Sequence, residues 1–356
     1  MGSGQTWLMQ ARPAGGLNPV EVYRMLAVEI SRHGGPDVLV PVDRADPVPA
    51  RGEVLVRNRW VGVNYVDLQH REGRPYPVTL PLVPGTEAAG TIVAVGPGVD
   101  ADLVGTPVVH FGHLAGVYAE LTAVPLDYVV PLPRDTPLDV AAAVALSGTT
   151  AYVLTSAAHR VGPGDVAVVH AAAGATGGAV VQRAAAAGAD VIAIASTAEK
   201  AAAATTLGAG HAIALRETPD PVAAVMSASG GQGADVVYDA TGRDTFEASL
   251  AMLATRGTLV LYGQSSGPVR PFDPGRLSGI TGDSGSAGSL TLRWVAASHY
   301  LSGPHERARA LTAVLDEVRS GKFNPRIAGR FPLRQAAQAH ALLARRTVQG
   351  KLLLQA

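Results

Sequence analysis

Cysteine is absent from this chain of 356 residues, and its absence excludes several kinds of chemistry at once. No disulfide, thiolate nucleophile, Cys-x-x-Cys redox pair or cysteine-ligated zinc site can form. Lysine is also scarce, since only Lys200, Lys322 and Lys351 occur among the 29 basic residues.

The chain also lacks an excess of charge of either sign. Its 29 basic and 29 acidic residues cancel, so we expect no nucleic-acid partner. No stretch reaches 18 uninterrupted apolar residues, so we expect no membrane partner. The first 24 residues lack the basic segment and long apolar run of a secretory signal, which makes a cytoplasmic enzyme the expectation.

What is present suffices for folded cores. Hydrophobic residues make up 47% of the chain and charged residues 16%, and the length is typical of two domains. The Gly- and Pro-rich residues 1–24 are interpreted as an N-terminal extension, with the compact fold beginning at Met25.

The pattern of short apolar runs divides the rest of the chain. From Met25 to about Ala145 the runs are strand-like and separated by Gly, Pro and Asp turns. From residue 165 strands alternate with helices of about ten residues, which predicts a doubly wound parallel sheet. After Trp294 we expect a helix at 305–320, a strand at 326–331, a helix at 333–344 and a last strand, all returning to the first unit. Residues 279–288 are the most linker-like interior stretch. The fold class is therefore α/β.

The segment HAAAGATGGAVVQ, residues 170–182, holds the central motif. Ala172, Gly174 and Gly177 give A-x-G-x-x-G after an apolar strand and at the start of a helix, the context of a dinucleotide-binding turn. Small residues allow the pyrophosphate to approach, and the helix N-terminus offers free N–H groups to it. The alternative is a plain strand–turn–helix with small residues for packing.

The next strand ends at Ser196 without an acid at its tip. An Asp or Glu there would bind the ribose 2′-hydroxyl of NAD. Ser196 and Lys200 instead suit a 2′-phosphate, which accepts hydrogen bonds and attracts positive charge. Glu199 complicates this interpretation, and we assign it to the first turn of the following helix. The sequence favours NADPH over NADH.

Several segments together resemble the zinc-independent quinone oxidoreductases, the zeta-crystallin-like branch of the medium-chain dehydrogenase/reductase superfamily. They are GVNYVDLQHREGRPYP (62–77), PGTEAAGTIVAVGPGV (84–99), SGTTAYVL (147–154), VHAAAGATGGAVVQ (169–182), GADVVYDATGRDTFEASLAML (233–253), LYGQSSGPVRPFD (261–273) and AQAHALLARRTVQGKLLL (337–354). The resemblance implies a GroES-like β-rich catalytic domain, residues 25–149 and 295–356. A Rossmann NADP-binding domain, residues 150–294, interrupts it, and the active site lies in the cleft between them.

The resemblance also implies roles for individual residues. The residues at the substrate side and near the nicotinamide are Asn64, Tyr65, Asp67, Tyr76 and Thr149, for which the alternative is turn and helix-cap chemistry. The residues expected to hold the cofactor are Gly174, Ala175, Thr176 and Gly177 at the pyrophosphate, Ser196, Lys200 and Arg346 at the 2′-phosphate, and Gly263 and Ser265 toward the nicotinamide.

In zinc-bearing relatives two metal ligands occupy the positions of Asn64 and Thr86, and neither of these is a good zinc ligand. We therefore expect no metal, and His110 and His113 lack a nearby carboxylate partner in the sequence. The chain departs from the family pattern at Ala175 and Thr176 of the loop, and at Leu215, where a tyrosine is common. An insertion near 280–287 is a further departure.

GQSSG, residues 263–267, also fits the G-x-S-x-G nucleophile elbow of serine hydrolases. An elbow needs a helix directly after it, and PVRPFDP follows here, so we reject a hydrolase. The expected function is an NADPH-dependent reductase that transfers a hydride to a quinone-type acceptor without zinc. The alternatives are an enone or enoyl-thioester reductase and a non-catalytic NADPH-binding protein. A strand near Ser289–Arg293 at the edge of the parallel sheet predicts a homodimer.

Overall fold

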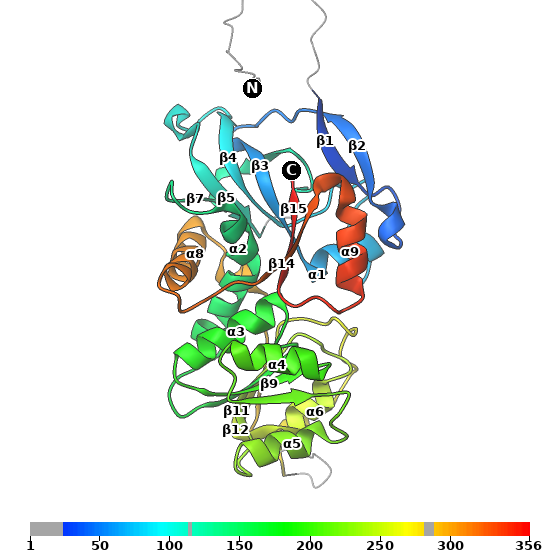
Figure 1. Ribbon diagram of the computed structural model, residues 1–356, viewed down its shortest axis with the longest axis vertical. Helices are drawn as coiled ribbons and strands as arrows, with labels where there is room; N and C mark the ends of the chain where they lie inside the picture. Colours follow the sequence, from blue (N-terminus) through cyan, green and yellow to red (C-terminus); the bar gives the residue numbers. More distant parts are fainter. Residues whose placement is uncertain (1–23, 113–115, 281–287) are drawn as a thin grey trace, which may run out of the picture.

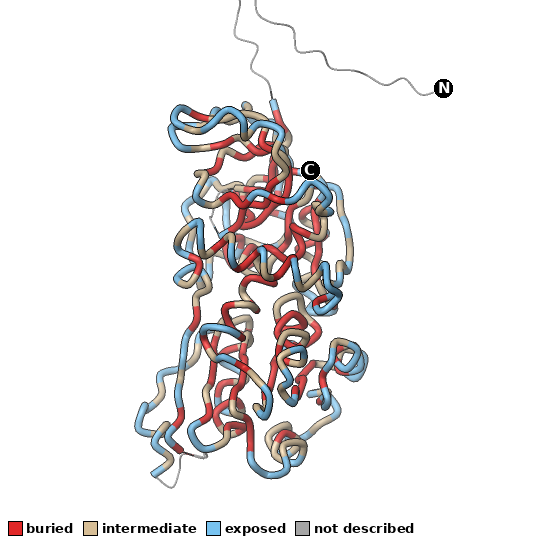
Figure 2. Tube along the Cα trace, turned by 90° about the vertical axis from the view of Figure 1, so that its left-hand side faces the viewer, coloured by how far each residue is buried: buried red, intermediate tan, exposed pale blue. Residues whose placement is uncertain are grey.

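Two β-sheets, one above the other along the long axis of the molecule, organise the computed structural model (Figure 1). The structure describes residues 24–112, 116–280 and 288–356. The expected extension up to residue 23, the insertion at 281–287 and His113 lie outside the described residues. Buried residues run through the interior of both halves (Figure 2).

The upper sheet has seven strands in the order β14-β15-β3-β4-β5-β7, with β6 also paired to β3. Their bounds are β3 Glu53–Val63, β4 Glu87–Val95, β5 Pro107–Phe111, β6 Leu121–Pro125, β7 Val129–Pro131, β14 Ile327–Pro332 and β15 Lys351–Gln355. A separate antiparallel pair, β1 Arg24–Glu29 and β2 Val40–Ala45, lies beside it. The last strand, β15, pairs antiparallel with β3, so the end of the chain returns to the first unit as expected.

The lower sheet has six parallel strands in the order β10-β9-β8-β11-β12-β13. Their bounds are β8 Val166–His170, β9 Asp190–Ala195, β10 His211–Ala214, β11 Ala234–Asp239, β12 Leu253–Leu261 and β13 Thr291–Trp294. The helices between them are α3 Ala175–Ala186, α4 Ala198–Thr206, α5 Pro221–Ala228 and α6 Phe246–Ala251. In chain order this is third-second-first-fourth-fifth-sixth, the Rossmann order, so the expected doubly wound sheet is confirmed.

Helices α1 (Tyr65–Glu72) and α2 (Leu138–Val153) correct the expectation of strands alone between Met25 and Ala145. The first has only eight residues, too few to establish a helical period, and the second is Ala- and Val-rich without a polar face. The remaining helices are α7 Ala297–Tyr300, α8 Pro304–Arg319 and α9 Ala336–Ala344. The last two match the expected helices to within three residues.

Helix α2 continues as a π-helical turn, Leu154–Ala158. This 21-residue stretch is long and apolar enough to cross a membrane, although polar residues interrupt its apolar run. However, 67% of its most apolar window is buried inside the protein, against the upper sheet and helices α3 and α8. Its apolar residues are accounted for by packing in the core.

Candidate active site

The N-terminus of α1 holds the first group of predicted site residues. Asp67 is fully buried, and its Oδ2 accepts a hydrogen bond from the backbone N–H of Asn64 over 2.8 Å. This bond caps the helix, since it satisfies a backbone donor at its start. Burial raises the pKa of Asp67 to about 7, and its Oδ1 is buried without a hydrogen-bond partner. Asp67 therefore lies behind Asn64 and fixes the start of α1.

A chain of buried hydrogen bonds ends on Asp67. Arg71 donates to Nδ1 of His340 over 3.2 Å, because a guanidinium can only donate. Burial lowers the pKa of His340 to about 3, so the ring is neutral and its Nε2–H faces the Tyr118 hydroxyl at 2.9 Å. Tyr118 then donates to Asp67 over 3.2 Å. All three donors point the same way, toward the carboxyl group.

Asn64 is held in a second buried cluster, which also contains Thr86. These two residues stand at the positions of two zinc ligands in zinc-bearing relatives. The Asn64 amide donates to Glu87 over 2.8 Å and to Thr86 over 3.4 Å, and its Oδ1 accepts from the Lys351 ammonium over 2.5 Å. Lys351 also forms an ion pair with Glu87, and the side chains are 3% and 0% exposed. The second carboxylate oxygen of Glu87 accepts from the backbone of Leu146. The Asn64 amide is thus fixed by protein partners on both sides.

The turn after β8 has the geometry that a pyrophosphate requires. A Cβ on Gly177 would lie 2.4 Å from the Ala171 carbonyl oxygen, so only glycine fits there. Gly174 is the N-cap of α3, and the N–H groups of Ala175, Thr176 and Gly177 in the first turn have no acceptor within the helix. This arrangement fits the phosphates of a dinucleotide.

The end of β9 carries the residues expected at a 2′-phosphate. Ser196 follows the strand directly, and Thr197 caps α4 by accepting the backbone N–H of Lys200. Burial lowers the pKa of the Lys200 ammonium, and the positive charge of Arg216 lowers it further. Arg216 is exposed and comes two residues after β10. Two positive charges therefore act on each other beside the end of β9, and the acid Glu199 lies in the first turn of α4.

A third group joins the two halves of the molecule. The Tyr65 hydroxyl donates to the Ser265 carbonyl over 3.2 Å, and the Arg346 guanidinium donates to the same oxygen over 2.7 Å. The backbone carbonyl of Arg346 accepts from the Lys200 ammonium. Arg346 thus contacts the expected nicotinamide side with its guanidinium and the expected 2′-phosphate side with its backbone. A Cβ on Gly263 would lie 2.7 Å from the Ala240 carbonyl oxygen, so this loop also requires glycine.

The C-terminal segment, residues 346–351, links all three groups. Besides the contacts of Arg346 and Lys351, Gln349 donates to Glu199 over 2.8 Å, and the backbone N–H of Gly350 donates to the Ala173 carbonyl over 3.0 Å. Gly174 and Gly350 form an isolated β-bridge. Six consecutive residues therefore reach the upper site, the glycine turn and the start of α4.

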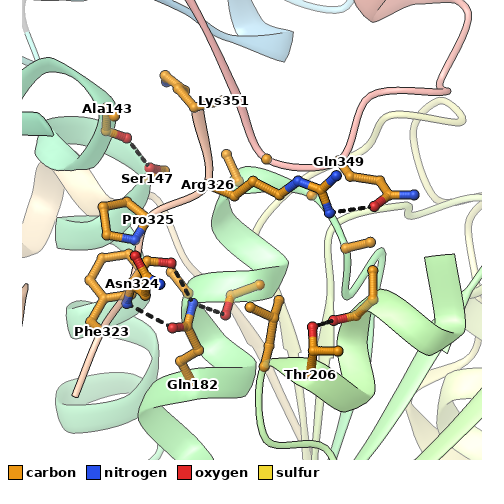
Figure 3. A pocket seen from close by; sticks show the side chains of 18 residues that line it. Ala143, Ser147, Gln182, Thr206, Phe323, Asn324, Pro325, Arg326, Gln349 and Lys351 are labelled. Carbon is orange, nitrogen blue, oxygen red and sulfur yellow. Dashed lines mark hydrogen bonds between the residues drawn. The ribbon is translucent and has the colours of Figure 1, made fainter. Parts of the chain in front are cut away.

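A small cavity lies beside this segment, on the flank of α3 (Figure 3). Gln182 of α3 bonds to the backbone of Asn324 there, and Arg326 donates to Gln349 over 2.6 Å. The cavity adjoins the glycine turn at Gly174 but does not contain Tyr76, Tyr65 or Ser265. It marks the contact between the two halves rather than the place of an acceptor.

Two further predicted residues lie apart from these groups. Tyr76 is 38% exposed in the loop between α1 and β4. Thr149 is fully buried in α2, where its hydroxyl donates to the Ala145 carbonyl. His110 is buried and within hydrogen-bond distance of Asn58, at 3.0 Å. Among the described residues, no three His, Cys, Asp or Glu side chains are grouped as metal ligands.

GQSSG lacks the helix of a nucleophile elbow. After β12 ends at Leu261 the next helical turn is the 3-10 helix Pro274–Ser278. Ser265 contacts other residues through its backbone: its carbonyl accepts from Tyr65 and Arg346, and its N–H donates to the Ala240 carbonyl over 3.2 Å. Both findings agree with the rejection of a hydrolase.

Sequence reasoning missed Arg216, Gln349 and the role of Lys351. The sequence holds a weak signal for Arg216 and for Lys351. Arg216 follows the position where the family often has a tyrosine. Lys351 is one of only three lysines, and it stands at the start of an apolar strand where a charge is unexpected.

Comparisons with known proteins agree with this geometry. Residues 50–134 match the alcohol dehydrogenase GroES-like domain and residues 175–287 the zinc-binding dehydrogenase family. The chain is 38% identical to a 2-haloacrylate reductase of Burkholderia sp over 335 residues, 93% of this chain and 98% of that protein. It is 35% identical to quinone oxidoreductase 1 of Escherichia coli K12 over 92% of this chain and 98% of that one.

The fold is shared over the same length. The structure of an Escherichia coli quinone oxidoreductase in complex with NADPH superposes with a TM-score of 0.88 at 35% identity, covering 93% of this chain and all of that one. The GroES-like domain and the Rossmann sheet are both confirmed. The chain belongs to the quinone oxidoreductases of the medium-chain dehydrogenase/reductase superfamily.

Proposed function

We propose that this protein is an NADPH-dependent reductase that acts on a quinone-type small molecule without zinc. The observation that carries the cofactor assignment is the pair of cations, Lys200 and Arg216, at the end of β9, where the one acid of the following helix, Glu199, is bound to Gln349. The glycine turn before α3 fits the pyrophosphate, because a Cβ on Gly177 would meet the Ala171 carbonyl. The relative solved with NADPH supports the same cofactor.

NADPH, when bound, would supply the hydride, and the protein would position it and the acceptor. The first turn of α3 would hold the phosphates, and Tyr65 with Arg346 would fix the Ser265 loop on the nicotinamide side. Asn64 would shape the cleft wall rather than donate to the acceptor, since both ends of its amide already have protein partners.

The proposal of a reaction without zinc rests on the positive charge of Lys351, which lies beside Asn64, the position of a zinc ligand in zinc-bearing relatives. The Lys351 ammonium lies between Asn64 and Glu87, where it already neutralises the carboxylate. A divalent cation in the same place would be repelled by this charge and would find an amide and a hydroxyl, both poor zinc ligands. The acceptor must therefore be polarised by hydrogen-bond donors.

A screen of NADPH oxidation against quinones, enones and enoyl thioesters tests the function. We expect turnover with quinones, a preference for NADPH over NADH, and no change on treatment with a chelator. Activity that a chelator removes and zinc restores would contradict the zinc-free mechanism. Equal kcat/KM for both cofactors would contradict the cofactor assignment.

An enone or enoyl-thioester reductase is the second candidate. The 38% identity to a 2-haloacrylate reductase favours it, because a haloacrylate is an α,β-unsaturated acid. Faster turnover of enones than of quinones in the screen would favour this candidate. Binding of NADPH without turnover of any acceptor would instead indicate a non-catalytic protein.

Tyr76 is the proposed donor to the acceptor oxygen. Tyr76→Phe keeps the ring and removes one hydrogen bond, so kcat should fall about tenfold with a quinone and more with an enone. A preorganised donor to a developing oxyanion contributes a factor of about 10²–10³, and a quinone ring disperses part of the charge itself. Steady-state kinetics with both acceptors measure the effect. Unchanged kcat with both, at unchanged NADPH affinity, would reduce Tyr76 to a packing residue.

We propose that the protein is a homodimer in the cytoplasm. Strand β13 is the last strand of the lower sheet, and Trp294 at its end is 48% exposed. Light scattering should therefore give twice the chain mass of 36.4 kDa, and Trp294→Glu should shift it toward one chain. A single-chain mass at micromolar concentration would contradict the dimer.

The two proposed domains differ in role. We propose that residues 25–149 with 295–356 form the catalytic domain and residues 150–294 the cofactor domain. Helix α2 crosses the first of these boundaries, since it runs from Leu138 to Val153.

A further inference from the structure

Gln349 lies between an arginine and a glutamate that belong to different halves of the molecule. Its amide oxygen accepts from Arg326 over 2.6 Å, and its amide nitrogen donates to Glu199 over 2.8 Å (Figure 3 shows the first bond). Arg326 fixes the orientation of the amide, because a guanidinium has only N–H groups and so must face the oxygen. The NH₂ group is therefore left to face Glu199. Gln349 is 8% exposed, so its position is set by packing.

Glu199 is the only acid in α4, and it precedes Lys200 in the first turn of that helix. An acid near this end of a Rossmann strand binds the ribose hydroxyls of NAD and repels a 2′-phosphate. In this structure one oxygen of Glu199 is bound to Gln349 of the C-terminal segment. Lys200 is bound to the Arg346 carbonyl of the same segment.

We propose that Gln349 is a positioning residue for cofactor selectivity, which holds the Glu199 carboxylate away from the ribose and leaves Lys200 and Arg216 to meet a 2′-phosphate. The inference rests on the proposed use of NADPH. Without the amide, the Glu199 carboxylate is free to pair with Lys200 and to accept from a ribose 2′-hydroxyl. Both changes favour NADH at the expense of NADPH.

Gln349→Met keeps the shape of the side chain and removes the amide. The test measures the affinity of the full-length variant for adenosine 2′,5′-bisphosphate and for adenosine 5′-monophosphate by calorimetry, together with kcat and KM for NADPH and NADH. We expect affinity for the bisphosphate to fall about tenfold, the effect of one hydrogen bond to a charged group. Affinity for the monophosphate should hold or rise, because the freed carboxylate can accept from its ribose 2′-hydroxyl. KM for NADPH should rise while kcat is retained.

Two further variants separate selectivity from structure. In a Glu199→Gln background there is no carboxylate to hold, so Gln349→Met should no longer change the ratio of the two affinities. Gln182→Met is the matched control, because Gln182 makes a similar contact between the halves at the same cavity, with Asn324 and no acid. It should leave the ratio unchanged.

An equal loss of both affinities in Gln349→Met, or the same loss in the Glu199→Gln background, would show a merely structural role and overturn the inference. If the parent protein prefers the bisphosphate and Gln349→Met leaves the ratio of the two affinities unchanged, the inference is overturned and the proposed use of NADPH stands. A parent protein that binds both probes equally would overturn both.

Discussion

Replacing Lys351 with methionine is expected to lower the free energy of unfolding by about 3–5 kcal/mol, because it leaves a buried carboxylate without its counter-charge. Glu87 is fully buried, and the Lys351 ammonium is its charged partner in the ion pair. The same substitution removes the bond that orients the Asn64 amide, so activity should fall as well. Denaturant unfolding followed by circular dichroism measures the first effect.

Two variants make this result interpretable. Arg319→Met breaks the ion pair between Arg319 and Asp316, two side chains that are 54% and 60% exposed. The free energy of unfolding should fall by at most about 1 kcal/mol. The double variant Lys351→Met with Glu87→Met removes both buried charges and should recover much of the lost stability. A loss in Lys351→Met no larger than in Arg319→Met would mean that the buried pair does not stabilise the fold.

Lys200→Ala should lower kcat/KM for NADPH by tenfold to several hundredfold and leave NADH nearly unchanged. Charge-assisted hydrogen bonds to a phosphate contribute about 1.5–3 kcal/mol each, which corresponds to this range. The loss should exceed that of Arg216→Ala, because Lys200 is partly buried and Arg216 is exposed. Steady-state kinetics with each cofactor, at one acceptor concentration, provide the measurement.

Lys322→Ala is the matched control for this lysine. Lys322 is exposed after the end of α8 and does not line the cavity beside the glycine turn, so its loss should change neither cofactor. If Lys200→Ala reduces kcat/KM equally for NADPH and NADH, the ammonium contributes to the fold or to the Arg346 contact rather than to a 2′-phosphate.

The parallel sheet was predictable because each of its parts has a local signal. The strands are short apolar runs, and the glycine turn at Gly174 and Gly177 stands between a strand and a helix. The strand-end residues Ser196 and Lys200 follow from the same periodicity. Helix α2 was missed because a buried helix that is apolar on every face has no amphipathic period to detect.

The contacts of the candidate site were harder to predict because they join distant parts of the chain. Asn64 and Lys351 are 287 residues apart, and Glu199 and Gln349 are 150 apart. Composition and spacing give the residue types but not which side chain occupies which space. The cap that Asp67 gives the backbone of Asn64 is a local contact over three residues, in line with the helix-cap alternative for Asp67. That the Asn64 amide is fully engaged within the protein follows only from its packing against Glu87 and Lys351.

The place of β15 in the upper sheet has a consequence for how the protein is made. The strand ends one residue before the last, and it lies between β14 and β3, which begins near residue 53. The upper sheet can therefore close only after residue 355 has left the ribosome, whereas the lower sheet draws only on residues 166–294 and is able to fold earlier. The same late residues, 346–351, complete the site, so a chain shortened before residue 346 keeps every strand of the parallel sheet and lacks the residues that assemble the candidate active site.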